Sequence, residues 1–518
     1  MIKLCKAILL ISLFAFRFLS SDFSYLPNKK KYYVLYKNKN NKTYKTEYVE
    51  MTQQKLIKQY SKYDIVIVDI TLDEKEYEYK DLQTKIIKNI NFDIKFKDNI
   101  ILSYDEMIAN DIIIKNASLV DITALNKFLE KRNIYYRFQD INKVKFLTCE
   151  SYILKNKKLV SLTEGPLFKI VDTNEKLSYL DKIIQNSSNR LVEMNDKISG
   201  EFIYGYFILN GKIIRGYDSL RHVGAIWSLI LSYLRFPKNE LKKVIDRAIK
   251  FFIKYYLYNG QTTDIYFLKD KKYLNIGGNG LALLVLSEYQ MAFNDNKYFN
   301  IAEKLANGII YAQKENGQII HKYNLDYSVY KEFCISYFDG EVIFALMKFY
   351  ELTKKKKYLN SVTKAIDYFI EKKYELYFDH WITYALNEFF RYNHSEKYIL
   401  FMTKHYNPWE ITEFRPARIE ELMSVYDSYE YLKSLNISSP SLERLSRDKL
   451  LESVHFCITN LLKYYIDDEM RFYLNYEDQV MYGFYSASKN NRMRIDDIQH
   501  TLGALIHYKD LKDIKILN

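Results

Sequence analysis

Apolar residues recur at helical spacing through most of the chain after residue 174, whereas the earlier part alternates short β-branched runs with polar or helical pieces. The runs KYYVLYK, YDIVIVDITL and NIILSY, all between residues 31 and 104, are typical of strands. We therefore predict a small α/β domain over 21–165 and a mainly helical domain over 166–518. The boundary is expected near 165–175.

The helical region contains an internal repeat. Residues 279–300 match residues 339–360 at a constant offset, and residues 379–400 match the same stretch at a smaller one. A Lys-Tyr pair stands at the same place in each copy, where a turn is expected. Each copy therefore predicts a helical hairpin.

Apolar periodicity predicts twelve helices in this region. They cover roughly 176–197, 218–235, 239–258, 279–294, 297–313, 339–353, 356–372, 379–391, 395–405, 416–435, 442–465 and 496–510. With only 15 Gly and 6 Pro, the composition also favours long helices over many tight turns. Pairing consecutive helices from 218 onwards leaves the last helix to partner the first. The predicted fold is thus mainly α, an (α/α)6 toroid of six helical hairpins preceded by a small α/β domain.

The first helix of each hairpin is expected to lie on the inner wall, so that the inner helices run in one direction and their N-termini share a mouth. Three of the eight histidines, His222, His380 and His500, fall at these N-termini. Asp218, Asp339 and Asp379 stand where N-capping acids belong, and capping alone would explain each of them. Capping does not explain the histidines. Aligned helix N-termini also favour an acidic or hydroxyl-bearing ligand.

On these features, residues 176–518 resemble the six-hairpin glycosidase-like superfamily of (α/α)6 toroids. The likeness rests on the hairpin repeat and on helix starts of the type YFDGEVIFAL (337–346) and DHWITYALNEF (379–389). That superfamily includes glycoside hydrolases, polysaccharide lyases and sugar epimerases. The resemblance therefore implies the toroid fold and an activity on carbohydrates.

Candidate site residues follow from the chemistry that such a mouth could support. Candidate catalytic residues are Asp339, Asp379, Glu341, His380, Asp496 and His500; candidate substrate-binding residues are Arg221, His222, Trp227, Tyr337, Trp381 and Arg418. Glycoside hydrolysis needs two carboxyl groups, and Asp339 with Asp379 is the preferred pair for proton transfer. Epimerisation or elimination on a uronic acid needs a base, a His or Tyr donor and an Arg.

The leading functional hypothesis is a glycoside hydrolase that uses paired carboxylates. A uronic-acid lyase or epimerase is the first alternative. The second is a non-catalytic glycan-binding or envelope-assembly scaffold. An enzyme should lose activity at one or two carboxylates, whereas a binder should tolerate the loss of any one with a graded effect.

The N-terminal segment 1–20 has a basic start, an apolar run and small residues after it, which predicts a signal peptide or an N-terminal anchor. We therefore expect an exported protein, periplasmic, secreted or envelope-associated. An uncleaved segment would allow association with a membrane surface. The cysteines are too widely spaced to imply a disulfide framework.

The formal net charge of +13 suits an anionic partner such as an acidic glycan. Nucleic acid is not expected, because the lysines are scattered along the chain. We expect no cofactor, because the GGNG stretch at 277–280 lacks the Lys and Ser/Thr of a phosphate loop. We expect no metal, because neither a Cys-x-x-Cys nor a His-Glu-x-x-His spacing occurs.

Overall fold

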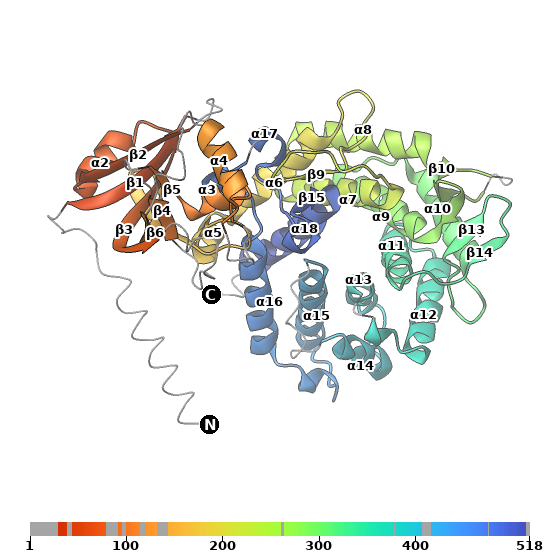
Figure 1. Cartoon of the computed structure of the whole chain (residues 1–518). Helices are drawn as coiled ribbons and strands as arrows, with labels where there is room; N and C mark the ends of the chain where they lie inside the picture. The colour runs from red at the N-terminus through yellow and green to blue at the C-terminus, as the bar shows by residue number, and fades with distance from the viewer. Residues whose placement is uncertain are drawn as a thin grey trace. The chain divides into compact units, whose positions relative to one another are not determined.

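The computed structural model divides the chain into two compact units, Met1–Val171 and Asp172–Asn518, each of which is described by itself (Figure 1). The described residues are 29–38, 44–78, 92–95, 100–113, 120–131, 143–260, 264–377, 379–406, 416–474 and 476–513. The predicted signal segment 1–20 lies outside them.

The first unit is built on an antiparallel sheet with the strand order β2-β1-β3-β6-β4-β5, to which β7 and β8 are added beyond β6. The strands are β1 Lys30–Lys37, β2 Lys45–Met51, β3 Ile65–Glu78, β4 Phe92–Lys95, β5 Ile101–Leu102, β6 Lys143–Lys155, β7 Lys158–Thr163 and β8 Ile170–Val171. Three helices accompany them, α2 Gln53–Tyr60, α3 Tyr104–Ala109 and α4 Ile122–Lys131. The apolar run that predicted a strand at 65–70 forms the fully buried first half of β3.

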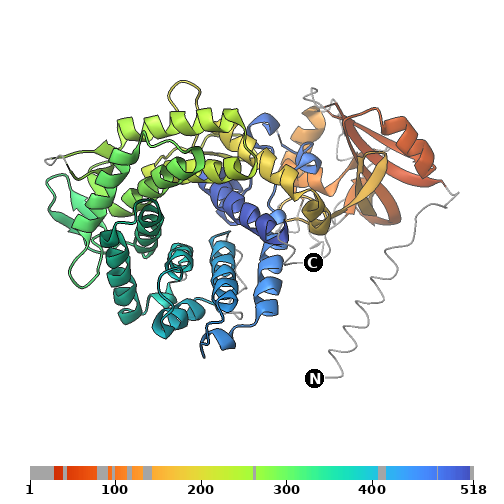
Figure 2. The same ribbon diagram turned by 180° about the vertical axis from the view of Figure 1, so that it is seen from behind.

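The second unit contains six inner helices, each in contact with the next. They are α7 Ser219–Arg235, α9 Ile276–Phe293, α11 Tyr337–Thr353, α13 His380–Phe389, α15 Pro416–Ser434 and α18 Ile495–Asp513. Helix α18 also contacts α7, which closes the ring. Figure 2 shows these helices from behind.

Six outer helices complete the hairpins. They are α6 Leu180–Met194, α8 Asn239–Tyr255, α10 Phe299–Ala312, α12 Lys356–Glu371, α14 Glu396–Lys404 and α16 Arg447–Leu462. Each outer helix except α6 packs on the inner helix that precedes it in the chain. Helix α6 packs on α18 and α7. The predicted pairing of the first and last helices is thus confirmed, and the second unit is an (α/α)6 toroid. The predicted helix 176–197 is divided at Tyr179 into α5 Thr173–Ser178 and α6.

Inner and outer helices differ in burial because of their places in the ring. Every residue of α9 from Ile276 to Tyr289 is buried, since this helix is covered on all sides. Helix α8 buries only one face, which includes Leu241, Val244 and Ile245, and exposes the other. Burial on every side therefore places α9 in the inner wall, and the single buried face of α8 places it on the outside.

Short strands lie next to the N-termini of the inner helices. Strands β10 Leu257–Tyr258, β11 Phe267–Asp270, β12 Tyr273–Asn275, β13 Lys322–Asn324 and β14 Val329–Lys331 form one sheet, and β9 Gly205–Phe207 pairs with β15 Arg492–Arg494. Strand β12 leads directly into α9, and β15 leads directly into α18. Among the described helices, none combines the length and hydropathy that a membrane span requires.

Candidate functional site

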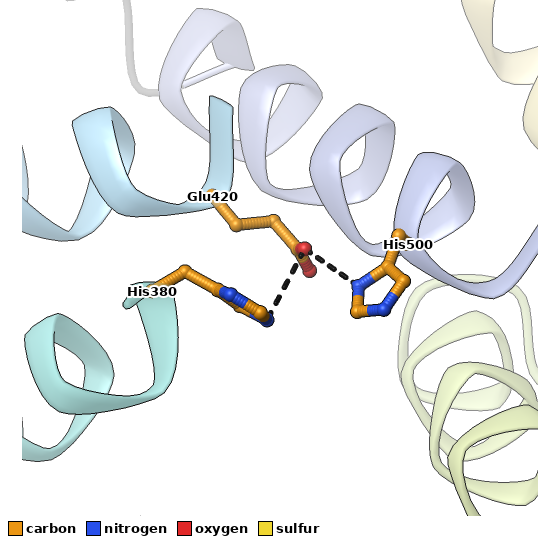
Figure 3. A group of neighbouring side chains, drawn as sticks. All are labelled: His380, Glu420 and His500. Carbon is orange, nitrogen blue, oxygen red and sulfur yellow. Dashed lines mark hydrogen bonds and ion pairs between the residues drawn. The ribbon is translucent and has the colours of Figure 1, made fainter. Parts of the chain in front are cut away.

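Helices α13, α15 and α18 bring His380, Glu420 and His500 together, and we call these three residues the histidine–glutamate cluster (Figure 3). The Oε2 atom of Glu420 lies 2.9 Å from Nδ1 of His500 and 3.7 Å from Nε2 of His380. The two imidazole rings lie 5.3 Å apart at a steep angle. One carboxylate therefore stands between two histidines from different helices.

The start of α13 fixes the position of His380. Asp379 is the N-cap of this helix, and its carboxylate accepts a hydrogen bond of 3.0 Å from the backbone nitrogen of Trp381. Gly340 of α11 permits the close approach of the two helices, since a Cβ atom there would lie 2.6 Å from Cβ of Trp381 and 2.8 Å from Oδ2 of Asp379. His380 is consequently buried at the seam between α11, α13 and α15.

The two histidines differ in their protonation. Burial disfavours the charge of His500, but Glu420 and Asp496 outweigh it and raise the pKa of His500 to about 9. Burial and the charge of His500 lower the pKa of His380 well below its usual value. Both ring nitrogens of His380 lack a hydrogen-bond partner within the described part of the chain. At neutral pH, His500 is thus a cation and His380 a neutral base.

Aromatic side chains surround this cluster on the interior side. The hydroxyl of Tyr384 donates to Oε1 of Glu420 at 3.2 Å. The rings of Trp227 and Trp381 lie 5.3 Å apart, and Phe344 stacks on Tyr384. This apolar layer excludes water from one side of His380 and so accounts for its neutral form.

Asp496 connects the cluster to the start of α7. Its Oδ2 atom accepts a hydrogen bond of 2.7 Å from Arg494, and Oδ1 lies 3.7 Å from Nε of Arg221 and 3.9 Å from Nε2 of His500. Burial would raise the pKa of Asp496, but His500, Arg221 and Arg494 together lower it below its usual value. Asp496 is therefore ionised. Arg221 is held in turn by Asp218, at 2.6 Å.

Glu341 is a buried acid at the start of α11. Its Oε2 atom has no hydrogen-bond partner among the described residues. Burial and then the charge of Asp379 raise the pKa of Glu341 well above its usual range. Its surroundings accordingly favour the protonated form of Glu341.

The preferred pair Asp339 and Asp379 lies on the same side of the ring, but each carboxyl group has other contacts. Oδ2 of Asp339 accepts a hydrogen bond from the hydroxyl of Tyr374 at 3.1 Å and lies 3.1 Å from Nε2 of His321. Burial raises the pKa of Asp339 in spite of these contacts. Burial, with the charges of Glu421 and Asp339, also raises the pKa of Asp379 well above its usual range, against the hydrogen bond from Trp381.

Two of the candidate residues, His222 and Arg418, make their contacts away from the cluster. His222 packs between α7 and α8, where Nε2 donates to the carbonyl of Ala248 at 2.9 Å and Nδ1 accepts from Tyr217 at 2.5 Å. Burial lowers the pKa of His222 to about 4. Arg418 donates to the carbonyl of His405 at 3.0 Å and pairs with Glu421.

The remaining candidates lie at or beside the cluster. The ring of Tyr337 lies 6.0 Å from that of His380, and Trp227 belongs to the aromatic layer. The sequence placed Glu420 at an inner-helix start but not among the candidate site residues, and it did not single out Tyr384. Pro416 is the signal that could have found Glu420, because a proline at the first helical position places residue 420 one turn into the helix.

The histidine–glutamate cluster has a donor set that could also hold a metal ion. One ligand atom from each residue lies within 4.8 Å of the others. Two imidazoles and a carboxylate suit Zn²⁺ or Fe²⁺. An ion would need His500 in its unprotonated form, in competition with the 2.9 Å pair that His500 makes with Glu420.

No protein-family model matches the chain, and no curated protein matches it. Among solved structures, the chain is similar to cellobiose 2-epimerase from Bacillus thermoamylovorans B4167, at 14% identity and a TM-score of 0.49 over 64% of this chain and 99% of that one. It is also similar to a D-mannose isomerase, at 13% identity and a TM-score of 0.47 over 65% and 97%.

A third similar structure is the GH76A alpha-1,6-mannanase from Salegentibacter sp. HEL1_6, at 11% identity and a TM-score of 0.46 over 64% and 99%. At these identities the likenesses concern fold alone. The toroid itself rests on the helix contacts of the second unit.

Proposed function

We propose that this protein is a carbohydrate-active enzyme that moves a proton at a sugar carbon, as a sugar epimerase or isomerase does. The observation that carries the proposal is the pair His380 and His500, whose pKa values are shifted in opposite directions on either side of Glu420. Groups whose environments push their pKa values apart are suited to act as base and acid.

The proposed mechanism uses the open-chain form of the sugar. A neutral nitrogen of His380 removes the proton from the carbon next to the carbonyl, and the electron pair of that C–H bond forms the enediolate. The imidazolium of His500 donates a hydrogen bond to the oxygen on which the negative charge develops. If the imidazolium of His500 then gives a proton to the same carbon from the other face, the epimer forms, His380 keeps the proton it removed, and exchange with water resets both histidines. If His380 returns its proton to the neighbouring carbon while a proton moves between the two enediolate oxygens, the isomer forms.

Glu420 is a positioning residue in this mechanism. Its carboxylate stabilises the charge of His500 and fixes Nδ1, which leaves Nε2 as the atom available to a substrate oxygen. Tyr384 holds the other oxygen of Glu420 and so limits its movement. The aromatic layer keeps water from His380, which preserves its basic form.

Glycoside hydrolysis is the second candidate, and one observation favours it. The pKa of Glu341 is raised and that of Asp496 is lowered, so the surroundings favour the protonated form of one carboxyl group and the ionised form of the other. Hydrolases require such a pair. In this candidate Glu341 and Asp496 take the roles that the sequence assigned to Asp339 and Asp379.

We also propose that the protein is exported and acts on an envelope or extracellular glycan. The support is the composition of segment 1–20, which lies outside the described residues. N-terminal sequencing of the protein from a secretory host tests this. Recovery of intact Met1 from the cytosol would contradict it.

The proposed chemistry is tested by NMR in D₂O with a panel of aldoses, ketoses and disaccharides. A proton-transfer enzyme converts one sugar into its epimer or isomer and introduces deuterium at the reacting carbon. His380→Asn and His500→Asn should each lower the rate by about a hundredfold or more. His507→Asn is the matched control, because His507 lies on the same helix and pairs with Asp427 instead.

Other outcomes discriminate between the alternatives. Formation of new reducing ends without deuterium at any sugar carbon would establish hydrolysis in place of proton transfer, provided that Glu341→Gln abolishes it. Binding without turnover of any sugar would indicate a scaffold. Loss of activity on dialysis against a chelator, with recovery on addition of Zn²⁺, would assign the cluster to a metal.

A further inference from the structure

We infer that an open pocket beside the start of α7 binds a second, neutral sugar unit, so that the substrate is an oligosaccharide or a longer glycan. The pocket has a volume of about 430 Å³ and lies in the segment 196–217 that leads into α7. The inference rests on the proposed function for the place of the reacting sugar. It adds a binding site that the histidine–glutamate cluster does not include.

Two tyrosines form the rigid side of this pocket. The rings of Tyr204 and Tyr217 lie 6.2 Å apart and are tilted by 56°. The hydroxyl of Tyr217 is fixed, because it accepts from the backbone nitrogen of Phe202 at 3.0 Å and contacts Nδ1 of His222 at 2.5 Å. Gly216 leaves the neighbouring space open: a Cβ atom there would have only the edge of Tyr204 near it, at 4.0 Å.

A short series of contacts connects the pocket with the cluster. The carbonyl of Tyr204 accepts a hydrogen bond of 3.1 Å from the backbone nitrogen of Ile495, and the preceding residue, Arg494, donates to Asp496 at 2.7 Å. Asp496 then lies 3.9 Å from Nε2 of His500. Strand β9, which follows Tyr204, pairs with β15, which leads into α18. The pocket and the cluster therefore share one end of the ring, and a glycan can extend from one to the other.

The lining matches the two kinds of surface that a sugar ring presents. The tyrosine rings and Ile213, which is 59% exposed, offer apolar contact to the C–H faces. Asp196, Glu201 and Arg215 offer hydrogen-bonding groups to the hydroxyls. The lining thus holds two carboxylates and one guanidinium, and this balance disfavours the binding of a sugar that carries a carboxylate. The high positive charge of the chain is thus not concentrated here, and the sugar bound here is a neutral one.

Binding of glucose- and mannose-based saccharides from one to four units tests the inference, measured by calorimetry and ligand-observed NMR on the full chain. Affinity should rise by about tenfold from the monosaccharide to the disaccharide or trisaccharide. Tyr204→Ala should remove this gain, and Tyr204→Phe should keep most of it because the ring remains. Tyr392→Ala, at the other end of α13, is the matched control.

A second variant protects the test against a failure to fold. Ile213→Ala with Arg215→Ala changes only exposed side chains and should also reduce the gain. Equal affinity for all chain lengths, no binding of any saccharide, or an undiminished gain in folded Tyr204→Ala would overturn the inference. If the wild-type protein shows this gain in affinity but no epimerase, isomerase or hydrolase activity, the proposed function is overturned and the sugar site remains.

Discussion

Replacing Glu420 with Gln removes the charge that keeps His500 protonated. A pKa of about 9 against the ordinary 6.5 corresponds to about 3 kcal/mol in favour of the imidazolium, at roughly 1.4 kcal/mol for each pH unit. In the variant, burial still disfavours the charge of His500. The carboxylate of Asp496 remains, but its Oδ1 atom lies 3.9 Å from Nε2 of His500. The pKa of His500 should therefore fall to about 6.5 or below.

The same change has a defined effect on stability. Because the folded-state pKa of His500 is raised, its stabilising contribution is fully present below about pH 6.5 and is lost as pH rises through about 9. Wild-type unfolding free energy should therefore decline over this window, by up to about 3 kcal/mol, and Glu420→Gln should lack that decline. Turnover at pH 7 should fall by about fourfold or more, because at a pKa of about 6.5 only about a quarter of His500 carries its proton at that pH.

The assay is NMR of the protein labelled at histidine with ¹³C, titrated from about pH 5 to about pH 10, with urea unfolding at matched pH values. Glu421→Gln is the control, since Glu421 is the next residue and pairs with His405 and Arg418. If His500 titrated near its ordinary value in the wild type, or kept a high pKa in Glu420→Gln, the electrostatic argument would be refuted.

Three further predictions concern activity and packing. The rate should stay high below pH 6.5, because the pKa of His380 is lowered, and should fall as pH rises through about 9, where His500 loses its proton; a pH–rate profile with the descending limb near neutrality would contradict this. Gly340→Ala should lower the free energy of unfolding by about 1–3 kcal/mol, because the added methyl group meets Trp381 and Asp379, and urea unfolding measures the loss. Asp379→Ala should cost about 1 kcal/mol as a lost N-cap, whereas Asp379→Asn should preserve both the cap and most of the turnover; a rate loss of a hundredfold in Asp379→Asn would restore the catalytic role that the sequence suggested for it.

Much of the toroid could be predicted because outer helices such as α8 and α12 show one apolar face, whereas inner helices such as α9 and α11 are apolar on most sides. The closure of the ring followed from the last helix, 495–513, which needed a partner for its apolar residues. The short strands next to the inner helices escaped prediction. Their pairing joins residues far apart in sequence, such as Gly205 with Arg494, and two to four residues carry too little pattern to indicate a strand.

The site was predicted in part, and the misplacements have geometric causes. Arg221 and His222 are neighbours on α7 and point about 100° apart, so they cannot both face the same neighbour. Arg221 faces Asp496, and His222 faces α8. Glu420 was placed at the mouth but not chosen as a site residue, because a glutamate in a polar helix start is usually solvated. Its complete burial arises only when α13 and α18 pack on both sides of α15.

The closing contact of α18 with α7 and α6 also sets an order of events during synthesis. Arg221 lies near the start of the helical domain, whereas Asp496 and His500 lie on the last helix of the ring. While the ribosome is still making α16, the emerging chain has five inner helices, an open seam and no His500. The histidine–glutamate cluster can assemble only after the chain has passed residue 500, so closing this long loop is expected to be the late, slow step of folding. Until then, the surfaces of α7 and α15 that α18 covers stay exposed, which makes the unfinished chain prone to aggregation.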